Sequence, residues 1–509
     1  SAQKKQSLKQ NDVFKEIGTK ILRTVMTVGF AMSSFIAQDV EAAGNGIVRV
    51  DGNTNLMQNG VANIYAEQVS GQVGLNRFQY FDVGSGQTAN LYFNQAGSTN
   101  YVNTLVNTVQ NRIDIGGTVN AIRNNKISGN LYFLSPQGMV IGAGGVVNAG
   151  SLTVLTPTQE AFSQYNSVAN LDFVNTAGVR NDVAIPINAS GTIEVHGTIN
   201  AATAVELQAG KIDVSRSANS SINPVIKTGV VFDEIVNNNI AGSIANQKLQ
   251  AQVDANGNVT FTDGTISGDG GIKLLATADK INDDTNKQVV AYVNVGQGAT
   301  VEAVGDVVIK ANANHEINVT KSTPSVSTHT ANTKAEITID GKVTGKNVDV
   351  QANATSTFNT TGINGIEQFF GGVIENVADM MPGKIGNVLK DKTNSFTKNI
   401  DLNLLKQTNF SYGGADAEAI ITINEHADIQ AVGVNNNSAL IGGDVNVNAE
   451  SYTLTNIKGA LLPTKSKNDG SNSNIDNPYL TLGIVYQENN SNSRVNVKGK
   501  IVSYNNLYI

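Results

Sequence analysis

Apolar and polar residues alternate along most of the chain in short runs, and glycine-containing turns separate the runs. In residues 293–311 the apolar positions lie two apart within each run. A period of two is that of a β-strand, because successive side chains of a strand point to opposite faces. Further copies of the template lie at 193–209, 259–276 and 337–352, with looser ones at 421–449 and from Val495 onward.

One copy of the template is too short to bury its own apolar face. The tight copies are 16 to 19 residues long, enough for one coil of two or three short strands. Stacked coils pair strand on strand in parallel and bury their inward residues in a continuous core. The sequence therefore predicts an all-β protein, a right-handed parallel β-helix or β-solenoid. If about 420 mature residues form coils of about 20 residues spaced about 4.8 Å apart, the rod is roughly 100 Å long.

Several stretches interrupt the strand pattern. Residues 321–334, 463–478 and 487–494 are rich in Ser, Asn or Thr and are predicted to be loops. In 366–405 the apolar residues recur at a spacing of three to four on both sides of a Pro-Gly pair, which predicts an inserted helical hairpin spanning 364–406. This hairpin either packs on the flank of the rod or forms an interaction or membrane-contacting element, and the sequence leaves both open.

The first 42 residues have the order of a secretory signal peptide. Basic residues are concentrated in 4–23, residues 25–37 are apolar and uncharged, and 40–42 resemble a cleavage site. The apolar stretch is shorter than the roughly 20 residues of a transmembrane helix, so no stable membrane insertion is expected. We expect export; the alternative is an amphipathic first helix of a cytoplasmic domain. The chain begins with Ser and stops within a strand-like pattern, so we also expect a fragment of a longer protein.

Composition narrows the classes of function. Charged residues make up 15% of the chain, against about 25% in ordinary globular proteins. The 35 Lys and Arg against 42 Asp and Glu give a net charge of -7, which provides no general positive field for nucleic acid. The chain has no cysteine, which excludes disulfides, thiolate metal sites and cysteine nucleophiles. We therefore expect no nucleic-acid partner.

No constellation in the sequence predicts an enzyme. Each of the four histidines lies apart from any spaced ligand or nucleophile partner, and each is predicted to lie on the surface or on a face of the solenoid; they are His196, His315, His329 and His426. Isolated acids recur at outward template positions, where solubility explains them; they are Glu194, Glu302, Asp349 and Glu418. We predict no catalytic residue, metal site or cofactor.

Two glycine-rich segments also have structural interpretations. Residues 142–145 are followed by strand-like sequence rather than by a helix, so they predict a tight solenoid turn and not a phosphate-binding loop. Residues 267–271 combine Gly and Asp, with two further aspartates at 283–284. The nine-residue calcium repeat of secreted β-rolls is absent, and a calcium site is not predicted there.

A resemblance to a known family begins in the first third of the chain. Residues 73–83 contain Asn76-Arg-Phe78-Gln-Tyr-Phe81-Asp82-Val83. This run is similar to the Asn-x-Phe-x-x-Phe-Asn-Val element in the secretion domain of two-partner-secreted filamentous haemagglutinins and adhesins, including leukotoxin-type members. The similarity extends over residues 44 to about 160.

A second element of the same family follows. Asn111-Arg112 begins a run that ends at Ala121, and Ser135-Pro136-Gln137-Gly138-Met139 then leads to Gly142. The family usually has Asn-Pro-Asn-Gly-Ile at the second place; here Ser135, Gln137 and Met139 differ, while Pro136 and Gly138 remain. Since proline fixes φ and glycine accepts a positive φ, the segment predicts a tight bend between two apolar strands, 131–134 and 139–141.

The resemblance implies a function in secretion and adhesion. It implies that an outer-membrane barrel transporter engages a secretion domain at 43–270, and that 271–509 form the stalk of the adhesin. We expect an exported protein at the cell surface or outside the cell, which acts as a filamentous adhesin or haemagglutinin on an unidentified host-cell or bacterial receptor. The alternatives are a leukotoxin-type cytotoxin, a β-solenoid carbohydrate-active enzyme and the passenger of a single-chain autotransporter.

Overall fold

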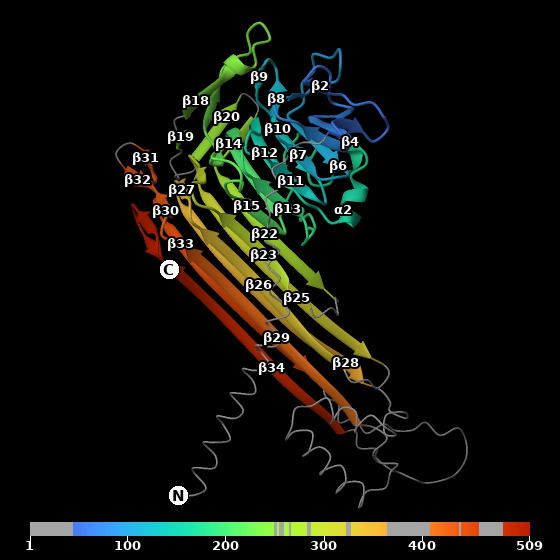
Figure 1. Ribbon diagram of the computed structural model, residues 1–509, viewed down its shortest axis with the longest axis vertical. Helices are drawn as coiled ribbons and strands as arrows, with labels where there is room; N and C mark the ends of the chain where they lie inside the picture. Colours follow the sequence, from blue (N-terminus) through green and yellow to red (C-terminus); the bar gives the residue numbers. More distant parts are fainter. Residues whose placement is uncertain are drawn as a thin grey trace, which may run out of the picture.

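The structure of the protein is a computed structural model that describes residues 44–248, 252–253, 259–263, 266–281, 287–321, 327–363, 408–436, 439–457 and 482–509. In Figure 1 these residues form a rounded head that continues into a slab of long strands. The predicted signal peptide, helical hairpin and loop at 463–478 lie outside the described residues.

The described strands of the first half are β1 (Ile47–Arg49), β2 (Val61–Tyr65), β3 (Gln68–Ser70), β4 (Val73–Val83), β5 (Thr88–Tyr92), β6 (Thr104–Val109), β7 (Ile113–Ile115), β8 (Thr118–Arg123), β9 (Lys126–Ile127), β10 (Asn130–Leu134), β11 (Gly138–Ile141), β12 (Val146–Leu155), β13 (Thr192–Val195), β14 (Thr198–Ala209), β15 (Lys211–Val214), β16 (Val225–Lys227), β17 (Val230–Phe232) and β18 (Ile244–Lys248). Those of the second half are β19 (Gln252–Val253), β20 (Val259–Asp263), β21 (Ile266–Gly268), β22 (Ile272–Ile281), β23 (Val289–Val295), β24 (Thr300–Glu302), β25 (Val307–Lys321), β26 (Ser327–Ile339), β27 (Lys342–Gly345), β28 (Val348–Ile363), β29 (Thr408–Ile423), β30 (Asp428–Ala431), β31 (Val434–Asn436), β32 (Ala439–Ile441), β33 (Val445–Ile457), β34 (Leu482–Val497), β35 (Lys500–Ser503) and β36 (Leu507–Tyr508). The described helices are short: α2 (Gln159–Gln164) and the 3-10 turns η1 (Val168–Asn170) and η2 (Ala241–Ser243).

The strands stack in parallel on three faces, which confirms the predicted parallel β-helix. Face A contains β4, β6, β10, β12, β14, β22, β25, β28, β33 and β36. Face B contains the end of β4, then β7, β11, β13, β15, β23, β26, β29 and β34. Face C contains β2, β5, β8, the first halves of β12 and β14, then β16, β24, β27, β30 and β35.

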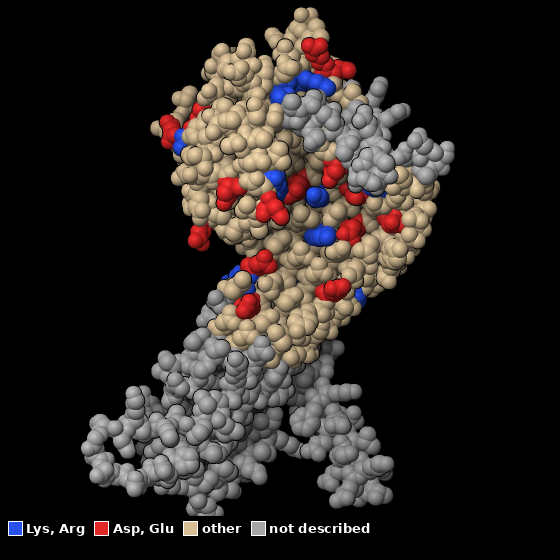
Figure 2. Space-filling view, turned by 180° about the vertical axis from the view of Figure 1, so that it is seen from behind, with Lys and Arg blue, Asp and Glu red and all other residues tan. Residues whose placement is uncertain are grey.

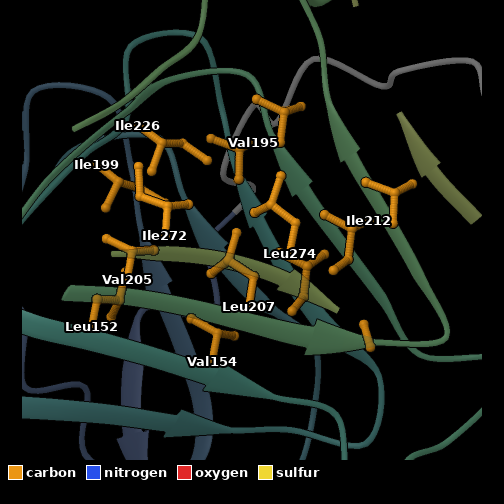
Figure 3. Close-up of a cluster of buried hydrophobic side chains, with 14 of the residues drawn as sticks. Leu152, Val154, Val195, Ile199, Val205, Leu207, Ile212, Ile226, Ile272 and Leu274 are labelled. Atoms are coloured by element: carbon orange, nitrogen blue, oxygen red, sulfur yellow. The ribbon is translucent and has the colours of Figure 1, made fainter. Parts of the chain in front are cut away.

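The core lies on the axis of the β-helix, where inward side chains of the three faces meet. In Figure 3, Leu152, Val205 and Ile272 from face A point toward Val195 and Ile212 from face B and toward Ile199 and Ile226 from face C. All seven are buried. Because the faces are parallel and in register, each apolar residue stacks on an apolar residue of the next coil, and the period-two pattern becomes a continuous core.

The coils are longer and fewer than the sequence predicted. Paired residues on successive coils of face A lie from 21 residues apart (Asn130 and Ser151) to 97 residues apart (Val348 and Val445). Face A contains ten strands, and nine spacings of about 4.8 Å amount to about 43 Å. The predicted rod of roughly 100 Å is therefore wrong for the described part, because much of each coil lies in long strands or in excursions from the helix.

In the second half of the chain the β-helix flattens into a blade made of β25, β26, β28, β29, β33 and β34. Here the long strands of faces A and B pack directly on each other. Hydrogen bonds join the facing sheets. Among them, the backbone amide of Asn332 donates to His315 Nδ1 at 3.1 Å, and Ser356 Oγ donates to the Asp416 carbonyl at 2.5 Å. Small inward residues allow this close approach; they are Ala311, Ala313, Ala331, Ala335, Ala352, Ala354, Ala415 and Ala417, all buried.

Two predicted loops prove to be strand. Residues 487–494 lie within β34, which pairs continuously with β29 from Leu482 to Val497. Most of 321–334 also belongs to strands, since β25 ends at Lys321 and β26 begins at Ser327. The side chains of 489–494 are all exposed, so this part of β34 has the polar composition that water-facing strands share with loops.

Additional segments cover parts of the β-helix. At the amino end β1 pairs antiparallel with β4, opposite Phe81, and β3 forms a second antiparallel pair with β4. Residues 157–187 lie over the outer side of face A, where Phe173 and Tyr165 pack against Tyr132 and Leu155. Of the helices described, none combines the length and apolarity needed to cross a bilayer.

Candidate functional site

The motif segments that carry the family resemblance lie on three successive coils. Strand β4 turns a corner: its first part pairs with β6 on face A, and its end pairs with β7 on face B. Phe81 lies beside Ile113 of β7, and Ile113 lies beside Met139 of β11. Segments separated by about 30 residues in sequence are thus neighbours at one corner of the β-helix.

Phe78 and Phe81 both point into the core. Their rings lie 5.2 Å apart in an edge-on arrangement, and the ring of Phe81 lies 5.1 Å from that of Phe133. Each of the three rings is fully buried. Residues three apart in a straight strand would point to opposite faces. The corner between them brings both rings inward, which explains the spacing of the motif.

Asn76 is buried inside the β-helix, and its side chain has three hydrogen-bond partners. Its Nδ2 donates to Asn107 Oδ1 at 3.0 Å, and its Oδ1 accepts from the Glu67 amide at 3.1 Å and from Arg49 at 3.2 Å. Asn107 in turn donates to the carbonyl of Tyr132 at 3.1 Å. The side chain therefore joins the antiparallel cap to the first parallel coils, a role that an apolar residue could not fill.

Asp82 and Val83 end the first motif on face B. Val83 is fully buried, and Asp82 is only 7% exposed and lies beside Asp114 of the next coil. Burial raises the pKa of Asp82 to about 6, and the neighbouring carboxylate of Asp114 adds to the rise. The exposed Arg112 pairs with Asp114 through Nε at 2.9 Å. Two acids thus stack on the corner, and one basic residue partly balances them.

The segment 135–138 forms the predicted tight bend. The Gly138 amide donates to the Ser135 carbonyl at 3.1 Å, and Gly138 has a φ of +96°. A Cβ at Gly138 would lie 1.7 Å from the carbonyl oxygen of Thr192 on the next coil, so the position requires glycine. Pro136 is buried, and its carbonyl accepts from Asn188 at 2.8 Å.

Ser135 links this bend to the second motif segment. Its Oγ donates to the carbonyl of Asn111 on the previous coil at 2.8 Å and accepts from the Gln137 amide at 3.3 Å. Asn111 itself donates to the carbonyl of Gln79 at 2.8 Å. Ser135 therefore makes a hydrogen bond between successive coils.

Gly142 begins the tight solenoid turn that the sequence predicted. Its amide donates to the carbonyl of Ile115 at 2.8 Å, and its carbonyl accepts from the Gly145 amide at 2.8 Å. A Cβ on Gly145 would lie 2.2 Å from the Ile115 carbonyl oxygen. Glycine is needed here because the coils approach closely, which confirms the structural interpretation of 142–145.

Most motif residues are inaccessible in the folded domain. The buried ones are Asn76, Phe78, Phe81, Asp82, Val83, Ser135, Pro136, Gly138 and Gly142. Arg112 and Gln137 are exposed, and Asn111 is half-buried. The motif therefore shapes the corner of the β-helix and presents two exposed side chains on neighbouring coils.

A ladder of asparagines crosses the same coils and was missed in the sequence. On face C, each member donates Nδ2 to the Oδ1 of the one before it, at 2.9 to 3.1 Å; the members are Asn63, Asn90, Asn120, Asn148 and Asn200. The sequence does contain a signal for the ladder, because each of these asparagines lies between two apolar residues in a short run flanked by turns. The ladder stops at Lys227, which pairs with Asn200 on the next coil.

Two of the four histidines contradict the prediction of surface positions. His196 is 1% exposed and His315 is fully buried. His426 is exposed, with Nδ1 3.2 Å from Asp340, and the side chain of His329 lies outside the described residues. His196 also has an acidic partner that the sequence analysis overlooked, since Nε2 lies 3.3 Å from Glu194 Oε2 two residues earlier.

His196 belongs to a polar cluster on face B. Its Nδ1 lies 2.7 Å from the carbonyl of Ser215, which follows β15. Asp213 in β15 accepts from Ser215 Oγ and from Asn294. The serine thus donates to the aspartate and does not face the imidazole. This arrangement lacks the nucleophile–base contact of a catalytic triad.

In the glycine- and aspartate-rich segment 267–271, Ser267 and Gly268 end β21, and 269–271 form the turn before β22. Asp269 Oδ1 accepts from the Gly271 amide at 2.9 Å, and Asp283 and Asp284 lie outside the described residues. Within the described ranges, no three His, Asp or Glu side chains are grouped so that they could hold a metal ion.

Comparison with protein-family models and with curated proteins finds no match to this chain.

Proposed function

We propose that the protein is an exported filamentous adhesin or haemagglutinin whose amino-terminal β-helix directs secretion through an outer-membrane barrel partner. The observation that carries the proposal is the meeting of the three motif segments on successive coils directly behind the antiparallel cap. Coils at that place would emerge first from a transporter that reads the amino-terminal end, and later coils could then stack on them.

The burial of the motif indicates when a transporter would read it. Phe78 and Phe81 are fully buried in the folded chain, so a partner contacts them only before the first coils close. Recognition would therefore act on the extended chain, and folding would then remove the motif from the partner. Stacking of each emerging coil on the previous one would favour outward movement, because every new coil buries apolar surface.

The remaining coils would display adhesive surfaces. A stack of coils in register holds its outward side chains in fixed rows, and many weak contacts along such rows add up through effective concentration. The blade would extend this surface with long strands whose outward residues are polar; they include Asn312, Asn353 and Thr338 together with charged residues such as Lys310 and Glu336. The receptor would be a molecule on a host cell or on another bacterium.

Export of the chain with and without the barrel partner tests the proposal. We expect secretion of residues 1–509 to require the partner and to fall at least about tenfold in Phe78→Ala, Phe81→Ala and Pro136→Ala. The matched control is Phe358→Ala, which removes an equally buried ring in the blade, outside the motif. If the control reduces export as much as the motif variants, loss of folding explains the result and the motif has no specific role.

Variants of the two exposed motif residues test whether the partner recognises the folded or the unfolded chain. Arg112→Ala and Gln137→Ala leave the core intact and remove the two exposed motif side chains. Unchanged export of this double variant would agree with recognition before folding. Export without the barrel partner would end the secretion proposal and leave an exported β-helix.

A further inference from the structure

An open groove lies on the outer side of face A, beside residues 177–180 of the covering segment 157–187. Its volume is about 340 Å³, within the lower part of the range for ligand sites. One wall is the turn Ala177–Arg180, and the other is the turn 268–271 before β22. Strands β10, β12, β14 and β22 form the floor.

Two rows of side chains cross the floor along the axis of the β-helix. The register places Tyr132, Thr153, Glu206 and Lys273 side by side in one row, and Asn130, Ser151 and Ala204 in the other. Neighbours in a row are one strand spacing apart, about 4.8 Å. The groove therefore offers hydrogen-bonding groups at regular intervals.

Small residues and well-held walls give the groove its depth. Ser151, Ala204 and Gly268 line it where larger outward residues would fill it. The first wall is anchored because Thr104 Oγ1 donates to the Gly178 carbonyl at 2.7 Å. The second wall is anchored because the Gly270 amide donates to the Thr203 carbonyl at 2.7 Å. The shape is thus built into the backbone.

The charges of the groove balance each other. Arg180 pairs with Glu206 at 2.7 Å, and Lys273 and Asp269 add one charge of each sign. Figure 2 likewise shows basic and acidic side chains interspersed on one face of the molecule, without a continuous patch of either sign. An anionic or cationic ligand would have to compete with these existing partners, so the groove favours an uncharged ligand.

The remaining lining selects among uncharged ligands. The amide of Asn130 and the hydroxyls of Ser151 and Thr153 can both donate and accept hydrogen bonds. Ser151 Oγ already donates to Asn130 Oδ1 at 2.7 Å, and Asn130 Nδ2 donates to Thr104 Oγ1 at 3.2 Å. An amide group has a second N–H and a hydroxyl has a second lone pair, so Asn130 and Ser151 could each still bond a ligand. An extended peptide binds best to an unpaired strand edge, whereas the floor strands are paired on both sides. Hydroxyl-rich ligands match this set of donors and acceptors.

From these observations we propose that the groove binds a short neutral saccharide. The ring of Tyr132 closes one end of the floor, and the Arg180–Glu206 pair offers donors and acceptors in its middle. This inference does not depend on the secretion proposal, because it concerns the folded protein and is read out by binding and not by export.

The test uses the purified chain of residues 1–509 on a printed array of neutral oligosaccharides that includes lactose, N-acetyllactosamine, cellobiose and chitobiose, with sialylated and sulfated glycans alongside. We expect binding to at least one neutral glycan. Ala204→Tyr fills the floor and is expected to weaken binding at least tenfold. Ser151→Ala removes one hydroxyl without adding volume and is expected to weaken it about fivefold.

The matched control is Thr355→Tyr, which places the same ring at an outward position of β28 in the blade and is expected to bind within twofold of the original chain. Binding only to charged glycans or to none overturns the proposal. The proposal is also overturned if Ser151→Ala and Ala204→Tyr both bind with the affinity of the original chain, since each variant alters the floor. A failure of Ala204→Tyr to fold leaves Ser151→Ala as the deciding variant.

Discussion

At the scale of single residues, the two buried histidines are held by opposite hydrogen-bond patterns. Both ring nitrogens of His196 face acceptors, the carbonyl of Ser215 and the carboxylate of Glu194. Nδ1 of His315 instead accepts from the amide of Asn332. Two acceptors require two N–H groups, so the geometry favours the imidazolium form of His196.

His196 is therefore expected to make stability depend on pH. Burial works to lower its pKa, but the hydrogen bonds to Glu194 and to the Ser215 carbonyl outweigh burial, and the pKa is raised. Since an unfolded histidine has a pKa of about 6.5, the stabilisation is complete below that pH and is lost as the pH rises through the folded pKa. The expected loss is about 1 kcal/mol of unfolding free energy, as for one hydrogen bond.

Urea unfolding at pH 6 and pH 9 measures this effect. His196→Gln cannot titrate in that range, so the difference between the two pH values should be smaller by about 1 kcal/mol in the variant. His426→Gln, at an exposed histidine paired with Asp340, serves as the control and should change the difference little. Equal pH dependence in His196→Gln and the original chain would contradict the assignment of a protonated His196.

At the scale of elements, the asparagine ladder is expected to stabilise the stacking of the first coils. Asn148 is fully buried, donates to Asn120 at 2.9 Å and accepts from Asn200 at 3.0 Å. Asn148→Ala would leave two buried polar groups without these partners. The expected loss is about 3 kcal/mol of unfolding free energy, measured by chemical denaturation.

The end of the ladder supplies the control for this prediction. Asn63 is exposed and has one ladder neighbour, Asn90, so water replaces the lost contact in Asn63→Ala. The expected loss there is below about 1 kcal/mol. Equal losses at Asn63 and Asn148 would show that the ladder contributes side-chain packing and not buried hydrogen bonds.

Local sequence chemistry was sufficient to predict some elements and not others. The bend at 135–138 follows from a fixed φ at Pro136 and a positive φ at Gly138, and both are local properties. The inward positions of both Phe78 and Phe81 depend on a corner in the middle of β4, which no local residue marks. The ladder was detectable in principle, because its asparagines occupy equivalent positions in the repeat, but it spans five coils of unequal length.

At the scale of the whole molecule, the period-two pattern predicted the class of fold because strand alternation is set by backbone geometry. Coil length was not predictable in the same way. Excursions such as 157–187 leave the β-helix, pack on apolar residues of its outer surface and then rejoin it. Their length depends on these contacts between residues far apart in the sequence. The blade also escaped prediction, since its alternating alanines resemble any half-buried strand until a second sheet is known to face them.

One buried core cluster runs through head and blade, but the length of the stack implies that its two ends open independently. Phe358 packs with Ile317 and Ala331 in a cluster separate from the main core, whereas Phe133 packs beside Phe81 in the main core. Each coil of a solenoid contacts mainly its neighbours, so the effect of a cavity should decay along the stack.

Amide hydrogen exchange on two matched variants tests this independence. Phe358→Ala should increase exchange in β25, β26 and β28 and leave β4 to β12 protected, and Phe133→Ala should do the reverse. Each removes a fully buried ring, worth about 3 to 5 kcal/mol, so a difference between them reflects position along the stack and not the size of the cavity. A uniform rise in exchange in either variant would mean that head and blade unfold as one cooperative unit, in which case the coils could not stabilise one another stepwise during export.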